Sequence, residues 1–254
     1  MRRVLVIGIG AGDPEHVTAQ AARALNEVDV FFVVDKGADA ADLVAARRAV
    51  LERFVDDPSY RIVDLRDPPR DRSAAAYDAA VDDWRARRAA VWGAALRDEL
   101  ADAETGGFIV WGDPSLYDST IDVMERIRAG GEVDLEYDVI PGVSSLHALT
   151  ARHRIALNRV GGAVQITTGR RLAREGWPDG VDDLAVMLDA DCAFTTVDSD
   201  GVEIFWGAYV GTRDELLVAG PLAEVADEIR RVRGEARTRK GWIMDTYVLR
   251  RRRD

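Results

Sequence analysis

Short apolar runs alternate with amphipathic stretches along the N-terminal part of the chain. Runs such as residues 4–7 and 30–34 are rich in β-branched and aromatic side chains and stop at glycine or aspartate. Apolar runs of this length, bounded by turn residues, are typical of parallel strands that are covered on both faces. Apolar positions three and four residues apart predict helices in the stretches between them. The pattern predicts strands at residues 4–7, 30–34, 61–65, 108–110 and 135–140, and helices near residues 21–25, 40–54, 77–96, 121–127 and 146–149.

The hydrophobic pattern of the sequence changes from Arg154 onward, where strand-like runs follow one another with few helical patterns between them. This β-rich spacing favours a second α/β domain with a more mixed sheet. We therefore predict two α/β domains, at residues 1–155 and 160–254, with the linker in residues 154–162. The second domain is predicted to hold strands at residues 164–168, 184–188, 204–210, 215–219 and 242–249, with its main helix at residues 222–232.

Three of the predicted strands of the first domain end in glycine-bearing turns, which begin at Gly8, Trp111 and Pro141. Glycine allows a backbone to approach a ligand closely or to adopt a positive φ. A serine in each of the last two turns, Ser115 and Ser144, is a candidate to cap a helix that begins there. The carboxyl ends of parallel strands share one edge of a sheet, and open α/β sheets bind their ligands at that edge. The turns therefore predict a ligand site there.

The first turn lacks the pattern of a dinucleotide site. A Gly-x-Gly-x-x-Gly fingerprint needs glycine where the chain has Asp13, whose carboxylate would repel a pyrophosphate. The chain also has no Walker loop, no serine-hydrolase elbow and no metal-ligand histidine spacing. The turns therefore favour a ligand that is not a phosphate, and ordinary tight crossovers are the alternative.

The formal net charge of −11 disfavours a general binder of nucleic acid or anionic membranes, because the field of the whole molecule repels polyphosphate. Arginines nevertheless gather in residues 152–174. Because arginine makes paired hydrogen bonds to carboxylates, this group suits a small polyanion, and solvated surface charge is the alternative.

Cys192 is the single cysteine of the chain. It excludes an internal disulfide framework and a multi-cysteine metal site, and it favours a reducing cytoplasm. No apolar run approaches the length needed to cross a bilayer. We predict a cytoplasmic protein without a bound metal.

Blocks at residues 8–14, 112–117, 141–145 and 220–222, together with Met187, resemble the tetrapyrrole methylases, S-adenosylmethionine-dependent enzymes of the cobalamin, sirohaem and related pathways. Longer blocks resemble, within that family, the members that act on precorrin-5. These longer blocks are residues 31–37, 110–120, 152–155, 166–171 and 241–247. The order and spacing of the blocks cover essentially the whole chain.

The resemblance implies two α/β domains with S-adenosylmethionine bound in the cleft between them. It implies methyl transfer to C1 of precorrin-5 with release of the C1 acetyl group as acetate, and it suggests a homodimer. Carried over by position, it implies a set of cofactor contacts. These are Ala11, Trp111, Gly112, Asp113, Ser144, Ser145, Met187, Gly207, Ala208 and Gly220.

The residue chemistry agrees in kind with this resemblance. A sulfonium carries one positive charge and no phosphate, so Asp13 and Asp113 are compatible with it. The substrate would be a macrocycle with several carboxylates, for which four arginines are candidate clamps, a structural network with Asp189 or Asp191 being the alternative. These arginines are Arg152, Arg154, Arg170 and Arg171.

Acetate release requires water to attack the acetyl carbonyl, which a base or an oxyanion donor would assist. Asp35, Tyr117 and His153 are the candidates for that role. Two alternatives remain at this stage: methylation of another precorrin or uroporphyrinogen carbon, and a noncatalytic module that binds S-adenosylmethionine.

Overall fold

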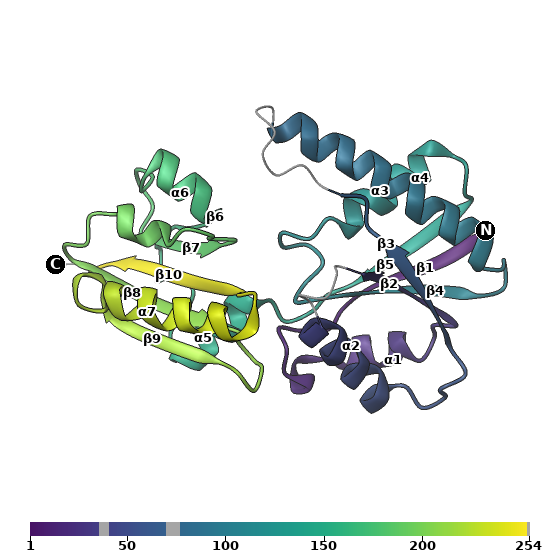
Figure 1. The fold of residues 1–254 in the computed structure, drawn as a ribbon, viewed down its shortest axis with the longest axis horizontal. Coiled ribbons are helices and arrows are strands. Elements are labelled where there is room, and N and C mark those ends of the chain that lie inside the picture. Colours follow the sequence, from purple (N-terminus) through teal and green to yellow (C-terminus); the bar gives the residue numbers. More distant parts are fainter. Residues whose placement is uncertain (36–40, 70–76, 253–254) are drawn as a thin grey trace. The chain divides into compact units, whose positions relative to one another are not determined.

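A computed structural model describes residues 1–35, 41–69 and 77–252 of the chain (Figure 1). The chain divides into two compact units, Met1–Val143 and Ser144–Asp254. Each unit is built around its own five-stranded sheet. No helix of the described residues is long and apolar enough to cross a membrane.

The first unit holds a sheet of five parallel strands in the order β3-β2-β4-β1-β5. The strands are β1 (Arg2–Gly8), β2 (Val30–Asp35), β3 (Arg61–Arg66), β4 (Thr105–Val110) and β5 (Leu135–Ile140). The helices are α1 (Ala19–Leu25), α2 (Ala41–Phe54), α3 (Tyr77–Glu99) and α4 (Thr120–Gly130). A short 3-10 helix at Pro14–His16 follows β1.

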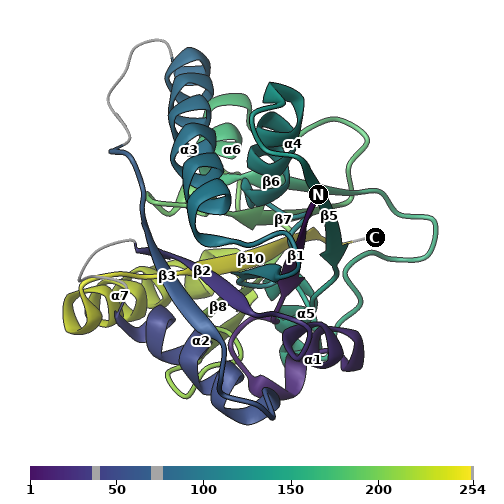
Figure 2. The ribbon, with the colours of Figure 1, turned by 90° about the vertical axis from the view of Figure 1, so that its right-hand side faces the viewer.

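Helices cover both faces of this sheet, as Figures 1 and 2 show, with α3 and α4 on one face and α1 and α2 on the other. On the first face, the fully buried indole of Trp92 in α3 stacks on Phe108 in β4, with ring centroids 4.7 Å apart. On the second face, Leu25 of α1 and Leu51 of α2 pack against Phe31 of β2. Two-sided burial explains why the strands read as nearly continuous apolar runs.

The second unit holds a mixed sheet in the order β6-β7-β10-β8-β9, in which β6 and β7 are parallel and the other pairs are antiparallel. The strands are β6 (Val164–Thr168), β7 (Asp183–Met187), β8 (Val202–Ala208), β9 (Leu216–Pro221) and β10 (Asp245–Arg251). The helices are α5 (Ser145–His153), α6 (Gly169–Glu175) and α7 (Leu222–Lys240), with a 3-10 helix at Ala193–Thr196.

The helices of the second unit also lie on both faces of their sheet. Leu172 of α6 and Ile229 of α7 share a core with Trp206 of β8. The preceding residue of β8, Phe205, points to the other face because side chains alternate along a strand. There it meets the ring of His153 from α5, with centroids 5.7 Å apart.

The predicted fold class is confirmed: a parallel N-terminal sheet covered by helices and a mixed C-terminal sheet. The predicted strands at residues 135–140 and 164–168 have the bounds of β5 and β6. The structure adds α6, which the apolar pattern does not predict because Leu172 is its one large buried apolar side chain. The division between the two units falls between Val143 and Ser144, because α5 packs on the second sheet.

Candidate cofactor and substrate site

The turns after β1, β4 and β5 come together at one edge of the first sheet, because these strands are neighbours and run parallel. The first two turns are joined by a backbone bridge. The amide of Gly112 donates to the carbonyl of Gly10 at 2.8 Å, and the amide of Gly10 donates to the carbonyl of Gly112 at 3.3 Å. The prediction that these glycine turns share a sheet edge is confirmed.

The backbones of these turns approach so closely that two positions admit no side chain. A Cβ at Gly142 would lie 2.1 Å from the carbonyl oxygen of Gly112. A Cβ at Gly8 would lie 2.7 Å from the Gly142 nitrogen and 2.9 Å from the same carbonyl oxygen. Both contacts are with backbone, which cannot swing away as a side chain would. Glycine is therefore required here by packing.

The carboxylate of Asp113 ties the turn after β4 to the turn after β5. One oxygen accepts the backbone amide of Ser115 at 2.8 Å, and the other accepts the amide of Gly142 at 2.9 Å. The Ser115 hydroxyl also hydrogen-bonds to Asp113. The expectation that Ser115 caps a helix is therefore wrong, because the next helix, α4, begins five residues later at Thr120.

The first turn carries Ala11, which is buried, and Asp13, whose carboxylate accepts the amide of Glu15 at 2.9 Å. This bond caps the 3-10 helix at Pro14–His16. Thr18 caps α1 by accepting the amide of Ala21 at 3.0 Å. The acidic side chain of this turn thus shapes its own loop.

In the second unit, the hydroxyl of Ser144 caps α5 by accepting the amide of His147 at 3.4 Å. Ser145 is the first residue of that helix. The predicted cap at the paired serines is confirmed for Ser144.

Met187 and Gly207 lie in one row across the second sheet, because both pair with Thr246 of the strand between them. Ala208 follows at the end of β8. Gly220 of β9 pairs with Ile204, which precedes Gly207 by three residues on β8. At the usual rise of a strand, Gly220 therefore lies about 10 Å from the row. The structure thus brings Met187, Gly207 and Ala208 together and sets Gly220 apart.

The three candidates for acetate release differ in their surroundings. Asp35 ends β2, and its side chain lies outside the described part of the structure. Tyr117 is exposed and has a positive φ of 52°, an uncommon conformation for a bulky residue. The half-buried ring of His153 has Nε2 3.0 Å from the carbonyl oxygen of Trp206, and burial lowers its pKa. A neutral His153 is the form that could accept a proton.

The four candidate substrate arginines are all exposed: Arg152 lies in the last turn of α5, Arg154 directly follows that helix, and Arg170 and Arg171 lie in the first turn of α6. These helices lie on opposite faces of the second sheet. Arg152 pairs with Glu215 at 2.6 Å and Arg171 with Glu175 at 2.6 Å, whereas Arg154 has a left-handed conformation after α5. Asp189, one of the two acidic residues of the alternative structural network, accepts the Tyr247 hydroxyl at 2.7 Å.

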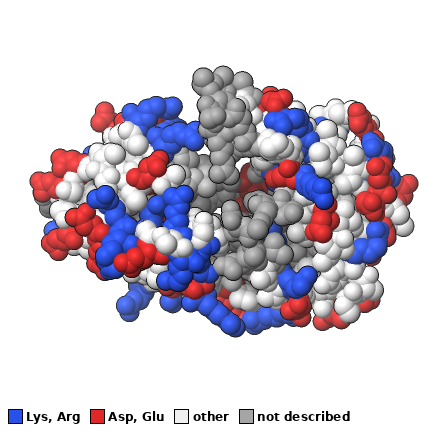
Figure 3. Space-filling model, in the orientation of Figure 1, with Lys and Arg blue, Asp and Glu red and all other residues white. Residues whose placement is uncertain are grey.

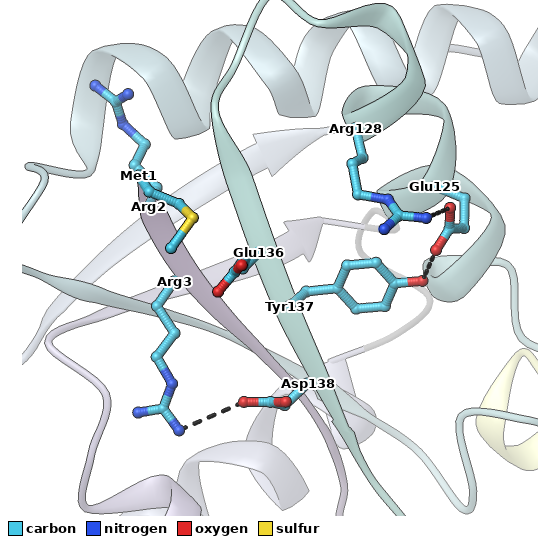
Figure 4. Close-up of a pocket in the computed structure, with 8 residues that line it drawn as sticks. All are labelled: Met1, Arg2, Arg3, Glu125, Arg128, Glu136, Tyr137 and Asp138. Atoms are coloured by element: carbon cyan, nitrogen blue, oxygen red, sulfur yellow. Dashed lines mark hydrogen bonds and ion pairs between the residues drawn. The ribbon is translucent and has the colours of Figure 1, made fainter.

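A larger hollow of about 480 Å³ lies away from the glycine turns, beside the first residues of β1 and the strand β5 (Figure 4). Two ion pairs lie within its lining: Arg3 lies 3.5 Å from Asp138, and Arg128 lies 2.7 Å from Glu125. Burial and a hydrogen bond to Glu125 raise the pKa of Tyr137 to about 12. This hollow lies toward the amino ends of the strands, the opposite edge from the usual ligand site of such sheets.

A smaller cavity of about 50 Å³ lies at the carboxyl ends of β2 and β4, next to Trp111. Arg47 and Arg88 also line it, and sequence analysis missed both because arginines within amphipathic helices resemble solvated charges. A signal was present for Arg88, which lies four residues from both Trp84 and Trp92 and is therefore flanked by two indoles on a helix. Among the described residues, no cluster of histidine, cysteine, aspartate and glutamate is suited to hold a metal ion.

Residues 3–226 match the family model of the Tetrapyrrole (Corrin/Porphyrin) Methylases. The chain is 50% identical over 254 residues to "Precorrin-6A synthase [deacetylating]" of Sinorhizobium sp, an alignment that covers 100% of this chain and 97% of the relative.

Solved structures agree with this similarity. A crystal structure of a cobalamin-synthesis-related protein, CobF, from Corynebacterium diphtheriae is 34% identical with a TM-score of 0.84, over 99% of both chains. The uroporphyrin-III C-methyltransferase of Thermus thermophilus, in complex with S-adenyl homocysteine, shares the fold at 19% identity and a TM-score of 0.59, over 97% of this chain and 91% of that one.

Proposed function

This chain belongs to the tetrapyrrole (corrin/porphyrin) methylases, and on that premise we propose that it methylates C1 of precorrin-5 and releases acetate to give precorrin-6A. The methyl donor would be S-adenosylmethionine. The 50% identity across the full chain to a relative named precorrin-6A synthase carries this proposal.

The residues at the glycine turns fit such a cofactor. The acidic groups of the turns after β1 and β4, Asp13 and Asp113, oppose an anion and tolerate a sulfonium. Gly8 and Gly142 let three backbone segments lie close together. S-adenosylmethionine supplies an activated methyl group on a sulfonium when bound.

We propose that cofactor contacts come from the two sets of residues that the sequence indicates. In the first unit these are Ala11, Trp111, Gly112 and Asp113. In the second unit these are Ser144, Ser145, Met187, Gly207, Ala208 and, less centrally, Gly220.

The protein's part in methyl transfer would consist mainly of positioning, because a tetrapyrrole carbon is already a competent nucleophile. Holding two reactants in line can supply roughly 7–11 kcal/mol of the barrier reduction. The short hydrogen-bonded turns serve this purpose, since Asp113 fixes the Gly142 backbone through a 2.9 Å bond. No covalent bond between enzyme and substrate is required.

Arg152, Arg154, Arg170 and Arg171 are proposed to bind carboxylates of the macrocycle. The salt bridges of Arg152 and Arg171 are solvent-exposed on the arginine side and contribute little stability, so a substrate carboxylate can displace their partners. Charge reversal at Arg170 is expected to weaken substrate binding, and unchanged affinity would contradict its role.

Asp35, Tyr117 and His153 are proposed as the groups that assist acetate release. Replacing each in turn, as Asp35→Asn, Tyr117→Phe and His153→Gln, should yield one variant that still transfers the methyl group but releases acetate slowly. If the ratio of the rate of acetate release to the rate of methyl transfer were the same in all three variants as in the wild type, none of the three groups would have this role.

The decisive test is mass spectrometry of the tetrapyrrole after incubating the protein with precorrin-5 and methyl-labelled S-adenosylmethionine, with acetate assayed in parallel. We expect one methyl group gained and one acetyl group lost. A methyl gained with the acetyl retained would indicate another acceptor carbon, and no transfer would overturn the proposed activity. We also propose a homodimer, as the family resemblance suggests, which light scattering on the eluted protein will test.

A further inference from the structure

Leu188 directly follows Met187 at the carboxyl end of β7, and its side chain is 64% exposed. Its φ is 53°, in the left-handed region that bulky side chains rarely adopt. An exposed leucine alone is ordinary in a folded protein. The combination is unusual, because the left-handed backbone is unfavourable for leucine and the exposed side chain gains little from burial.

Tyr209 shows how a folded protein normally stabilises such a conformation. It follows Ala208 at the end of β8 and has a φ of 50°. Its side chain is buried, its hydroxyl donates to the carbonyl of Trp242 at 2.6 Å, and its ring meets the Trp242 ring edge-on with centroids 5.0 Å apart. Burial and a hydrogen bond therefore offset the strain at Tyr209. Leu188 has neither, because its side chain is mostly exposed and has no polar atom.

The backbone is held on both sides of Leu188. Before it, the end of β7 pairs with β10. After it, the buried carboxylate of Asp189 accepts the amide of Ala193 and the hydroxyl of Tyr247, each at 2.7 Å. The carbonyl of Asp189 also accepts a hydrogen bond from Nη2 of Arg233 at 2.7 Å. The neighbours of Leu188 therefore impose its conformation in the protein without a ligand.

The position of Leu188 in the second sheet links it to the proposed cofactor contacts. β7 and β8 both pair antiparallel with β10, so they run in the same direction and end at the same edge. Met187 and Gly207 share a row across the sheet, and Leu188 and Ala208 each lie one residue beyond that row. A strained residue that its neighbours hold in place, and that folding does not require, is typical of a functional site.

We propose that Leu188 is a further contact residue of the ligand site, and that its side chain packs against the apolar face of a ring. This inference rests on the proposed function, which supplies two such rings: the adenine of S-adenosylmethionine and a pyrrole-derived ring of the tetrapyrrole. A ring placed over Leu188 removes apolar surface from water. Because the backbone is already fixed, binding does not have to order this part of the chain.

The test replaces Leu188 with asparagine, which tolerates the left-handed conformation and lacks the apolar surface. Leu188→Asn should therefore be at least as stable in urea as the wild type. We expect it to weaken binding of S-adenosylhomocysteine, or to raise the KM for precorrin-5, about tenfold. Leu188→Met keeps an apolar side chain of similar volume, so both values should stay within about twofold of the wild type.

The matched control is Val160→Asn, at a side chain that is 99% exposed. Val160 precedes β6, which runs parallel to β7, so it lies toward the opposite edge of the second sheet. This variant also exchanges an exposed apolar side chain for an amide. It should leave both the affinity for S-adenosylhomocysteine and the KM for precorrin-5 unchanged.

Calorimetric titration with S-adenosylhomocysteine and steady-state kinetics with precorrin-5 distinguish the two rings. Weaker binding of S-adenosylhomocysteine to Leu188→Asn would indicate that the adenine lies against Leu188. Unchanged binding with a raised KM for precorrin-5 would indicate the tetrapyrrole.

The same measurements separate failure of this inference from failure of the proposed function. If Leu188→Asn keeps both values of an active wild type, Leu188 is not a contact residue, and the proposed methylation stands. If it keeps both values but changes the mass measured by light scattering, Leu188 contacts a second copy of the chain, which also overturns the inference. If the wild type neither binds S-adenosylhomocysteine nor methylates precorrin-5, the proposed function and this inference both fail.

Discussion

At the scale of single residues, Asp113 matters as much for the shape of the site as for its charge. Its two oxygens accept amides from its own turn and from the turn after β5, at 2.8 and 2.9 Å. The sequence suggests a carboxylate suited to a sulfonium, and the structure adds that this carboxylate holds two loops together. Joining the two loops requires that each oxygen of Asp113 accept a hydrogen bond.

Asp113→Asn should therefore destabilise the protein. The amide replaces one acceptor with a donor, which leaves a backbone N–H of Ser115 or Gly142 facing another N–H. We expect a loss of about 1–3 kcal/mol in the free energy of unfolding, measured by urea denaturation. Asp138→Asn makes the same chemical change at an exposed ion pair, and it should cost no more than about 0.5 kcal/mol. Equal effects of the two changes would contradict the role of Asp113.

His153 should make stability depend on pH in a defined direction. Burial lowers its pKa in the folded protein relative to the unfolded chain, where histidine titrates near 6.5. The unfolded chain then binds the proton more readily, so His153 contributes stability above about pH 6.5 and loses it as the pH falls through the folded value. The difference in unfolding free energy between wild type and His153→Gln should be larger at about pH 8 than at about pH 5.5. The same difference at both pH values would exclude this linkage.

At the scale of elements, the turns between strand and helix show how close backbone packing restricts the sequence. The φ of Gly142 is not positive, so alanine suits its backbone conformation, but the added carbon would lie 2.1 Å from the Gly112 carbonyl oxygen. We expect Gly142→Ala to destabilise by about 3 kcal/mol or more, because backbone atoms must move apart. Thermal unfolding followed by circular dichroism will measure this loss.

The control for that change is Gly234→Ala in α7, at an exposed glycine with open space around its Cβ position. Alanine has the higher helix propensity, so we expect this variant to gain about 0.5–1 kcal/mol. Changes of opposite sign in the free energy of unfolding for the same glycine-to-alanine substitution would show that local packing decides the effect. Loss of stability in both variants would mean that helix propensity does not govern α7.

The sequence predicts most elements because their burial leaves a pattern in the chain. β5 and β6 were predicted with the bounds that the structure shows, and the edge where three glycine turns meet followed from parallel strand order. The row that joins Met187, Thr246 and Gly207 could not be predicted in this way, because register between distant strands depends on the whole sheet. Arg47 was missed for a related reason: its burial arises from α2 packing beside β2, which no local pattern records.

At the scale of the whole molecule, the formal net charge is −11, yet basic side chains gather on parts of the surface (Figure 3). Figure 3 shows basic side chains gathered over the second unit, where α7 lies in Figure 1, with acidic side chains among them. Several are paired along the helix, as Arg231 is with Glu235 at 2.9 Å. Paired charges of this kind give a solvated helix face and do not form the continuous basic surface of a nucleic-acid binder.

The proposed cofactor contacts in both units lead to a prediction for hydrogen exchange measured by mass spectrometry. Saturating S-adenosylhomocysteine, the expected product of the cofactor, should slow amide exchange in the turns at residues 8–12 and 111–113, because bound ligand stabilises the state that holds it. In the second unit it should slow exchange at residues 207–209, which end β8. The opposite end of β8, at Val202 and Glu203, is the internal control and should change less.

That comparison separates direct contact from general stabilisation. A ligand that merely stabilises the folded chain slows exchange equally at both ends of a strand, because both ends are exposed by the same global opening. Protection that is strongest at Gly207 and Ala208 and weaker toward Val202 would require that the ligand contact that end of β8. Protection confined to the first unit would show that Met187, Gly207 and Ala208 do not contact the cofactor. The proposed contacts would then be limited to those of the first unit.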